Sequence, residues 1–212
     1  MVFCILMFST MLSFLTALLM VVPALQGPVL KPRPAATTAS AATAPVVAAK
    51  PAPAPSIPWS ATRRLAIADF LGRPSYGDQL ASSTSSDIKA GASCRDFVFT
   101  GTVQATFDPN TSWFRNPKTA SEVLLRHEQL HFDITEVYAR VMRQKLVAFQ
   151  AKVNCEKLQP AFNNLTKGVY AEWNREQNRY DQETNHGLVA VRQVQWEQQT
   201  QVKLEALKAF AQ

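Results

Sequence analysis

An alternation of apolar and polar residues with a period of two runs through residues 97–107. One face of this segment carries Phe97, Phe99, Val103, Ala105 and Phe107. A strand with one side in the core and the other in solvent has this pattern, and the residues Asp108-Pro109-Asn110 that follow favour a turn. The sequence therefore predicts a strand at residues 97–107. Ser- and Gly-containing stretches at residues 82–86 and 91–93 indicate loops.

Three helical patterns occupy the second half of the chain. Thr119 and Glu122 form a capping box that predicts the start of the first helix. Its apolar stripe consists of Val123, Leu130, Ile134, Val137 and Val141. A second stripe at helical spacing consists of Leu158, Phe162, Leu165, Val169, Trp173 and Tyr180. Pro160 suits the start of this helix and Gly187 suits its end, while residues 188–210 predict a third helix.

The N-terminal part of the chain has the composition of an export signal followed by a linker. Residues 2–25 are almost wholly apolar and carry no charged side chain. We expect a signal peptide over residues 1–26, with an uncleaved signal anchor as the alternative. Residues 27–58 are rich in Pro and Ala, which favours an extended tether. An exported domain, periplasmic or secreted, should therefore span residues 59–212, with residues 65–70 as a short strand or turn at its entry.

The charge distribution argues against nucleic acid as a partner. The net charge is +6, from 22 basic and 16 acidic residues, and no stretch gathers the basic residues together. A nucleic-acid-binding surface usually concentrates Lys and Arg in one patch or stripe. Most charges are therefore expected on solvated helix faces, and contact with a membrane is expected through the N-terminal segment alone.

Two cysteines remain when Cys4, in the N-terminal apolar segment, is set aside. In an oxidising compartment an even pair favours a disulfide, so we expect Cys94 and Cys155 to be bonded. Reduced, buried thiols are the alternative, because free Cys packs as a small apolar residue.

His127-Glu128-Gln129-Leu130-His131 is the segment with the clearest chemistry. On a helix, two imidazoles four residues apart lie on one face and can reach a single metal ion. Neutral imidazole is a good ligand for Zn²⁺, and the carboxylate of Glu128 can serve as general base toward a metal-bound water. Two core histidines are the structural alternative, but they give no reason for a carboxylate between them. The segment therefore predicts a zinc site.

The third metal ligand is less directly specified. His186 is the remaining histidine of the chain, and a hairpin that reverses near Pro160 would bring it back to the level of His131. Carboxylates from a later helix are the alternative, namely Glu156, Glu172 and Glu176. Ile134 and Val137 stand where metzincin sites carry Gly and a further His, which excludes that class.

Residues just before His186 have candidate roles around the metal. Tyr180 could donate a hydrogen bond to the oxyanion formed during hydrolysis, or it could continue the apolar stripe of its helix. Asp181 and Glu183 could orient a ligand imidazole, or they could be solvated. The edge of the strand at residues 97–107 could bind an extended peptide, although core packing is the simpler role for its aromatic face.

These blocks together resemble a bacterial family of predicted secreted zinc-dependent proteases, also called domain of unknown function 922. The resemblance rests on LAIADFLGRP at residues 65–74, Ser112-Trp113, LLRHEQLHFDITEVYAR at residues 124–140, YDQETNHG at residues 180–187 and Gln195-Trp196. It covers the chain from about residue 59 to the end. Ile67 departs from the family, which usually has Trp there. The resemblance implies a metallopeptidase-like site in an exported bacterial protein.

The expected fold is α+β and zincin-like, with a small antiparallel sheet in the N-terminal half followed by three long helices that carry the metal site. The expected activity is hydrolysis of a peptide bond or amide. His127, His131 and His186 would hold Zn²⁺, Glu128 would act as general base, and Tyr180 would contact the oxyanion. The substrate would be a protein or peptide, with cell-wall peptides among the candidates. A non-catalytic envelope protein, in which a metal stabilises a binding module, is the alternative.

Overall fold

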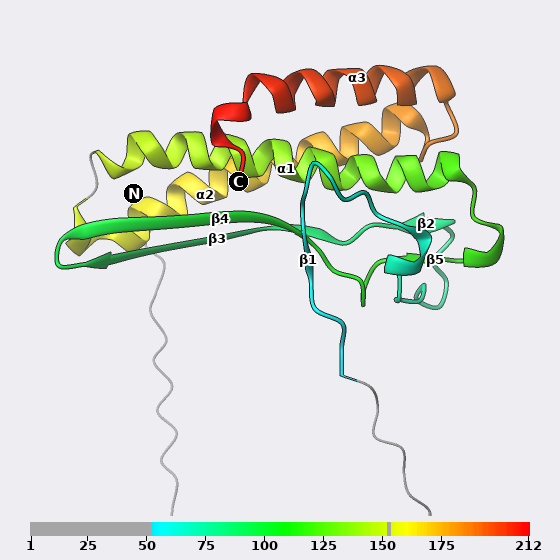
Figure 1. Ribbon diagram of the computed structural model, residues 1–212, viewed down its shortest axis with the longest axis horizontal. Coiled ribbons are helices and arrows are strands. Elements are labelled where there is room, and N and C mark those ends of the chain that lie inside the picture. Colours follow the sequence, from blue (N-terminus) through cyan, green and yellow to red (C-terminus); the bar gives the residue numbers. More distant parts are fainter. Residues whose placement is uncertain (1–51, 152–153) are drawn as a thin grey trace, which may run out of the picture. The chain divides into compact units, whose positions relative to one another are not determined.

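The computed structural model describes residues 52–151 and 154–212, and Figure 1 shows the arrangement of their elements. The strands are β1 (Ile57–Pro58), β2 (Ser82–Ser83), β3 (Ser86–Arg95), β4 (Val98–Phe107) and β5 (Trp113–Phe114). The helices are α1 (Glu122–Gln150), α2 (Leu158–Thr184) and α3 (Ala190–Ala206), with short 3-10 turns at Ile67–Asp69, Pro117–Thr119, Cys155–Lys157 and Lys208–Phe210. The predicted α+β class, with the strands before the helices, is confirmed. The predicted signal segment and most of the predicted linker lie outside the described residues.

β3 and β4 pair in an antiparallel ribbon along their full lengths. Asp96 and Phe97 form the turn between them, with φ angles of 50° and 63°, as tight turns that match the strand twist require. The strand predicted at residues 97–107 is confirmed as β4. The loop predicted at residues 91–93 is wrong, because these residues belong to β3 and pair with β4. Of the loop predicted at residues 82–86, Thr84 and Ser85 lie outside strands, whereas Ser82 and Ser83 form β2 and Ser86 begins β3. The residues that β3 turns toward the core are Ile88, Ala90, Ala92 and Cys94.

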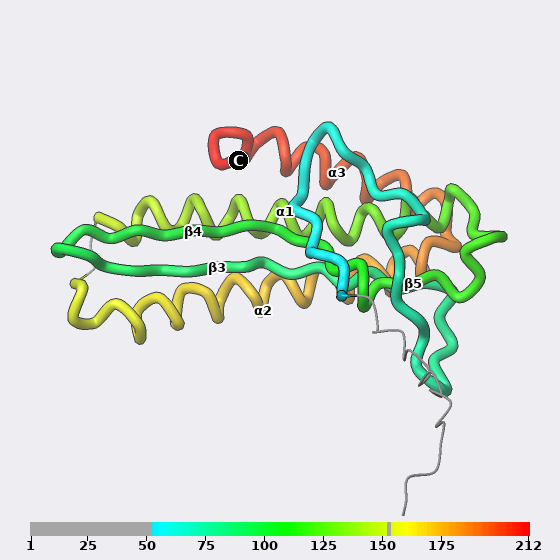
Figure 2. Tube along the Cα trace, turned by 60° about the horizontal axis from the view of Figure 1, so that its bottom comes forward, coloured from blue at the N-terminus to red at the C-terminus, as the bar shows by residue number. Residues whose placement is uncertain are grey.

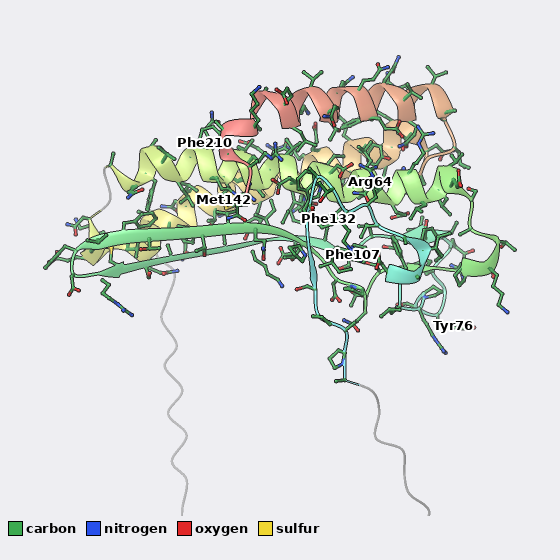
Figure 3. The ribbon with its side chains drawn as sticks, in the orientation of Figure 1. Arg64, Tyr76, Phe107, Phe132, Met142 and Phe210 are labelled. Carbon is green, nitrogen blue, oxygen red and sulfur yellow. A yellow bond between two sulfur atoms is a disulfide. The ribbon has the colours of Figure 1, made fainter. Side chains whose placement is uncertain are left out.

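The ribbon packs against α1 and α2, and α3 lies on the side of α1 away from the ribbon (Figures 1 and 2). Phe107 from the ribbon and Phe132 from α1 have ring centroids 5.9 Å apart. Figure 3 shows both residues, together with Met142, between the ribbon and α1. A second, smaller apolar cluster joins the three helices and consists of Leu130, Ile134, Tyr180 and Trp196. None of the described helices is both long and apolar enough to cross a bilayer.

α1 begins at Glu122 and is capped by Ser121. The Oγ of Ser121 accepts a hydrogen bond from the backbone N–H of Leu124 at 3.2 Å. Thr119 instead ends a 3-10 turn, so the predicted capping box is wrong. The predicted stripe is buried where α1 meets its neighbours, but Val123 in the first turn is half exposed.

The reversal between α1 and α2 is held by a disulfide. α1 ends at Gln150 and α2 begins at Leu158, which places Pro160 in the first turn of α2, as predicted. Cys94 of β3 and Cys155 of the reversal are bonded, with their Cα atoms 5.8 Å apart. The predicted disulfide is therefore confirmed, and it attaches the far end of the ribbon to the helical reversal.

Short strand pairs extend the structure at the end of the ribbon opposite its turn. β2 pairs with β5, and β1 pairs with the last residues of β4. Ala54 exchanges two hydrogen bonds with the side chain of Asn110, so the folded unit begins before Trp59, the boundary that composition predicted. Because β2 packs against α1, residues 80–84 lie beside the helix face that carries the HEQLH segment.

Removal of the disulfide should lower the free energy of unfolding. The bond joins residues separated by 61 positions, and cross-links of this kind stabilise a folded domain by about 2–4 kcal/mol. The variant Cys94→Ala/Cys155→Ala should therefore unfold at a lower urea concentration than the wild type, with an unchanged circular dichroism spectrum in the absence of urea. Reduced wild-type protein is the matched control and should show the same shift. An unchanged midpoint in both samples would contradict the prediction.

Candidate metal centre

His127, Glu128 and His131 lie on the face of α1 that turns toward α2 and β2. His127 and Glu128 are nearly inaccessible, at 2% and 3% exposure, and the side chain of His131 is 13% exposed. The helical spacing brings the Nε2 atoms of the two histidines to 3.3 Å from each other. The pentapeptide is therefore helical, as predicted, and the Nε2 atoms of its two imidazoles lie close to each other.

Asp181, near the end of α2, completes this group. Its Oδ1 lies 3.1 Å from His127 Nε2 and 2.9 Å from His131 Nε2. Among the described residues, these three side chains form the group that could hold one metal ion, with all their ligand atoms within 4.8 Å of one another. Ligand atoms of a tetrahedral zinc ion, each about 2.0–2.1 Å from the metal, are roughly 3.3 Å apart. The donor set and its spacing fit such an ion.

A glutamine orients each imidazole. The Nε2 of Gln177 donates to the backbone carbonyl of His131, so its Oε1 faces His131 Nδ1, at 2.7 Å. The Oε1 of Gln193 faces His127 Nδ1, at 3.3 Å, while its Nε2 donates to a carboxylate of α3. These acceptors place the proton of each ring on Nδ1. The two Nε2 lone pairs then face the same point, and a cation there would remove their mutual repulsion.

The charges of the group favour a cation at the imidazoles. Burial lowers the pKa of His131, but the hydrogen bond to Asp181 and the charges of Glu128 and Asp181 outweigh it, and the pKa is raised. Burial raises the pKa of Asp181, but the hydrogen bonds with His127 and His131 outweigh it, and the pKa is lowered. A proton and a metal ion compete for the same nitrogens, so metal affinity should fall as the pH is lowered.

Glu128 has one carboxylate oxygen held and the other free. The Oγ of Ser82 donates to Glu128 Oε1 at 2.6 Å. Glu128 Oε2 is the buried side-chain atom of the described residues that has no hydrogen-bond partner. An unpaired buried polar atom costs about 1–3 kcal/mol, and more when it is charged. A polar ligand in the adjoining pocket would offset this cost.

Glu128 lines a pocket between α1, the end of α2 and the segment before β3. The metal-ligand group, Glu128, His186 and residues 80–84 line this pocket. The predicted edge at residues 97–107 lines no part of it. Within the described chain, the strand next to the site is therefore β2, and β4 contributes to the core.

The structure brings Asp181 to the two imidazoles where the sequence predicts His186. α1 ends at Gln150, earlier than the predicted reversal, so α2 reaches the level of His131 at Asp181 and ends before His186. His186 has left-handed backbone, with φ of 53°, and is half exposed, with its Nδ1 3.5 Å from Asp181 Oδ1. It lies outside the group of converging ligand atoms. A ligand role for His186 stays a prediction.

The other carboxylates considered from the sequence lie away from this group. Glu172 and Glu176 form ion pairs with lysines of α1 and α3, and Glu156 is exposed at the helical reversal. Glu183 accepts hydrogen bonds from two side chains of α3. Asp181 is the carboxylate from the second helix that contacts the imidazoles.

Tyr180 lies behind His127, outside the residues that line the pocket. Its side chain is fully buried among the three helices, and its ring stacks on that of His127 with centroids 4.7 Å apart. Its hydroxyl donates to Gln193 Oε1 at 2.7 Å, and burial raises its pKa, which keeps it a neutral donor. This is the core position that its helical stripe allowed. The hydroxyl supports Gln193, and through it the orientation of His127; a contact with an oxyanion finds no support in this geometry.

Sequence reasoning missed three side chains around the site. Ser82 comes from a stretch that reads as a loop, and Gln193 lies on a helix rich in glutamine. Gln177 does leave a signal, because it precedes Asp181 by one helical turn. Two polar residues at that spacing on a helix that packs against α1 indicate a polar contact with α1.

Comparison with known families gives one match. The model of a family described as "Bacterial protein of unknown function (DUF922)" matches residues 87–187. This segment runs from β3 past the end of α2 and includes the metal-ligand group, Glu128 and His186. The match supports the family assignment that the motifs suggest. Searches of curated proteins and of solved structures each gave no match.

The third ligand can be identified from metal affinity. Asp181→Ala should weaken zinc binding by at least about 100-fold, because it removes one of three donor atoms, and His186→Ala should weaken it by about tenfold or less. Competition with a chromophoric chelator measures both values, with His127→Ala as the reference for a lost ligand. A larger loss in His186→Ala than in Asp181→Ala would make His186 the ligand and Asp181 a residue that orients the imidazoles.

Proposed function

We propose that this protein is an exported zinc-dependent peptidase or amidase. The observation that carries the proposal is the free, buried Oε2 of Glu128 in the same pocket as the converging His127, His131 and Asp181. Two imidazoles and a carboxylate are ligands of zinc in catalytic sites with three protein ligands. A carboxylate oxygen free to accept a proton beside such a site is the base that metal-assisted hydrolysis uses.

Each residue of the pocket would have a separate role in hydrolysis. When bound, zinc lowers the pKa of water and polarises a carbonyl group. Glu128 would accept a proton at Oε2 from the attacking water and later donate it to the leaving amine. Ser82 holds the other oxygen of that carboxylate, which limits its rotation. The glutamines at Nδ1 of His127 and His131 hold both rings in the orientation that directs their Nε2 atoms at one point.

Features outside the pocket support the proposed export and class of substrate. The uncharged apolar residues 2–25 and the disulfide between Cys94 and Cys155 both suit a protein of an oxidising compartment. A hydrolytic domain on a Pro-rich linker in the periplasm or outside the cell would act on proteins or peptides, cell-wall peptides included. The dispersed basic residues support no nucleic-acid partner.

A non-catalytic role, in which the metal stabilises an envelope binding protein, is the second candidate. The observation that favours it is the position of His186, which lines the pocket beside Asp181. A fourth protein ligand would close the coordination sphere, as in structural zinc sites. Hydrolysis would then be absent, and loss of the metal would show itself as loss of stability.

Glu128→Gln separates the two functions. The substitution keeps the shape of the side chain but removes the proton acceptor, so hydrolysis of casein or of cell-wall peptides should fall by at least about 10²-fold. Zinc content, measured by atomic spectroscopy, should remain at the wild-type level. Glu172→Gln, at a half-exposed position on α2 away from the pocket, is the matched control and should keep both properties. Equal hydrolysis by Glu128→Gln and wild type, or none by wild type, would contradict the peptidase.

A further inference from the structure

The imidazole ring of His127 is restricted by close packing. It stacks on the ring of Tyr180, with the two centroids 4.7 Å apart. Gly187, which has a φ angle of 82°, approaches so closely that a Cβ atom there would lie 3.0 Å from the Cβ of His127. Packing therefore limits the movement of the ring, and the hydrogen bond at Nδ1 sets which nitrogen carries the proton.

The groups around Oε1 of Gln193 are compatible with either orientation of its amide. The hydroxyl oxygen of Tyr180 lies 2.7 Å from this Oε1 and 3.2 Å from the backbone carbonyl of His127. A hydroxyl can donate to either oxygen or accept from an N–H group, so a reversed amide would still find a partner at Tyr180. The Nδ1 of His127, 3.3 Å from Oε1, likewise donates in one tautomer and accepts in the other. Neither neighbour fixes the amide.

The opposite end of the amide meets a group that can only accept. The Nε2 of Gln193 donates to Oε1 of Glu197 at 3.0 Å, one helical turn further along α3. A carboxylate has no proton to donate, so a reversed amide would place two oxygens against each other. Arg126 of α1 donates to both oxygens of Glu197 through Nε and Nη2, which holds the carboxylate in this position. Glu197 therefore selects the orientation of Gln193 that gives His127 an acceptor.

We propose that Glu197 is a positioning residue for His127. Through Gln193 it selects the tautomer with the proton on Nδ1, which leaves the lone pair of Nε2 available to a divalent cation. The proposal rests on the proposed function only for the zinc ion, and no step of hydrolysis enters it. His131 does not depend on Glu197, because the amide of its partner Gln177 donates to two oxygens of α1. His131 is therefore an internal control.

The zinc affinity of variants at the two ends of the ion pair tests the proposal. Glu197→Gln removes the charge that excludes the reversed amide, so the dissociation constant for zinc should rise by at least about tenfold. Arg126→Ala also breaks the ion pair between α1 and α3 but keeps the acceptor, so its dissociation constant should change by less than about threefold. Competition with a chromophoric chelator measures both. Equal losses in the two variants, or no loss in Glu197→Gln, would overturn the positioning role.

A double-mutant cycle shows whether Glu197 acts through Gln193. Gln193→Met removes the amide and keeps a side chain of similar size. In that background Glu197→Gln should raise the dissociation constant for zinc by less than about twofold, because no amide remains to be oriented. Additive losses would mean that Glu197 affects the metal by another route, against the proposal. Circular dichroism and urea unfolding of each zinc-free variant establish that the protein is folded.

The proton of His127 can be observed directly and without turnover. Nuclear magnetic resonance of zinc-loaded protein follows the Nδ1–H groups of His127 and His131. The Nδ1–H of His127 should exchange with water at least about tenfold faster in Glu197→Gln than in wild type, and that of His131 should not change. Faster exchange of both groups, or of neither, contradicts the proposal.

The positioning role and the peptidase can fail separately. Zinc binding that depends on Glu197, without hydrolysis by wild type, would support the positioning role and reject the peptidase. Hydrolysis by wild type, with a zinc affinity that Glu197→Gln leaves unchanged, would reject the positioning role and leave the peptidase in place.

Discussion

The site depends on holding two imidazoles and a carboxylate together between α1 and α2. Burial of polar groups is unfavourable unless each finds a partner, and here the partners come from all three helices. α2 supplies Gln177 and Asp181, and α3 supplies Gln193, whose Oε1 faces His127 and accepts from Tyr180. α3 is therefore part of the candidate metal centre although it contributes none of the converging ligand atoms, because Gln193 on that helix faces His127 Nδ1.

A second buried network holds α1 in place as the platform of the site. Glu136 accepts hydrogen bonds from Arg140 and Arg143 on the same helix. Arg140 also donates to the carbonyl of Leu204 at the end of α3, and Arg143 donates to that of Val103 in β4. Buried ion pairs add little net stability, but they penalise arrangements that separate the partners. The network thus joins α1 to the third helix and to the ribbon, away from the pocket.

Local patterns predicted the elements better than they predicted the contacts between elements. The alternation at residues 97–107 was enough for β4, and helical spacing was enough to place His127 and His131 on one face. β3 was missed because its Ser, Gly and Ala residues form a strand only through pairing with β4 and attachment at Cys94. Asp181 was assigned a supporting role, and His186 the ligand role, because the level at which α2 meets α1 depends on the reversal at residues 151–157. If the reversal shifts by a few residues, the side chain of α2 that faces His131 changes by about one helical turn. The position of the reversal cannot be predicted from a local sequence pattern.

The arrangement of Glu128 bears on whether the site would serve hydrolysis or stability. A metal held by His127, His131 and Asp181 would join α1 to α2, and its binding free energy would add to that of folding. Such a structural benefit requires the three ligands but not a second carboxylate with an unpaired oxygen. An apolar residue at position 128 would avoid the desolvation cost altogether. The chain instead keeps the carboxylate, holds one oxygen with Ser82 and leaves the other without a hydrogen-bond partner. A local arrangement that lowers stability without a packing benefit is characteristic of functional sites, and here the unpaired atom is the one that hydrolysis would use.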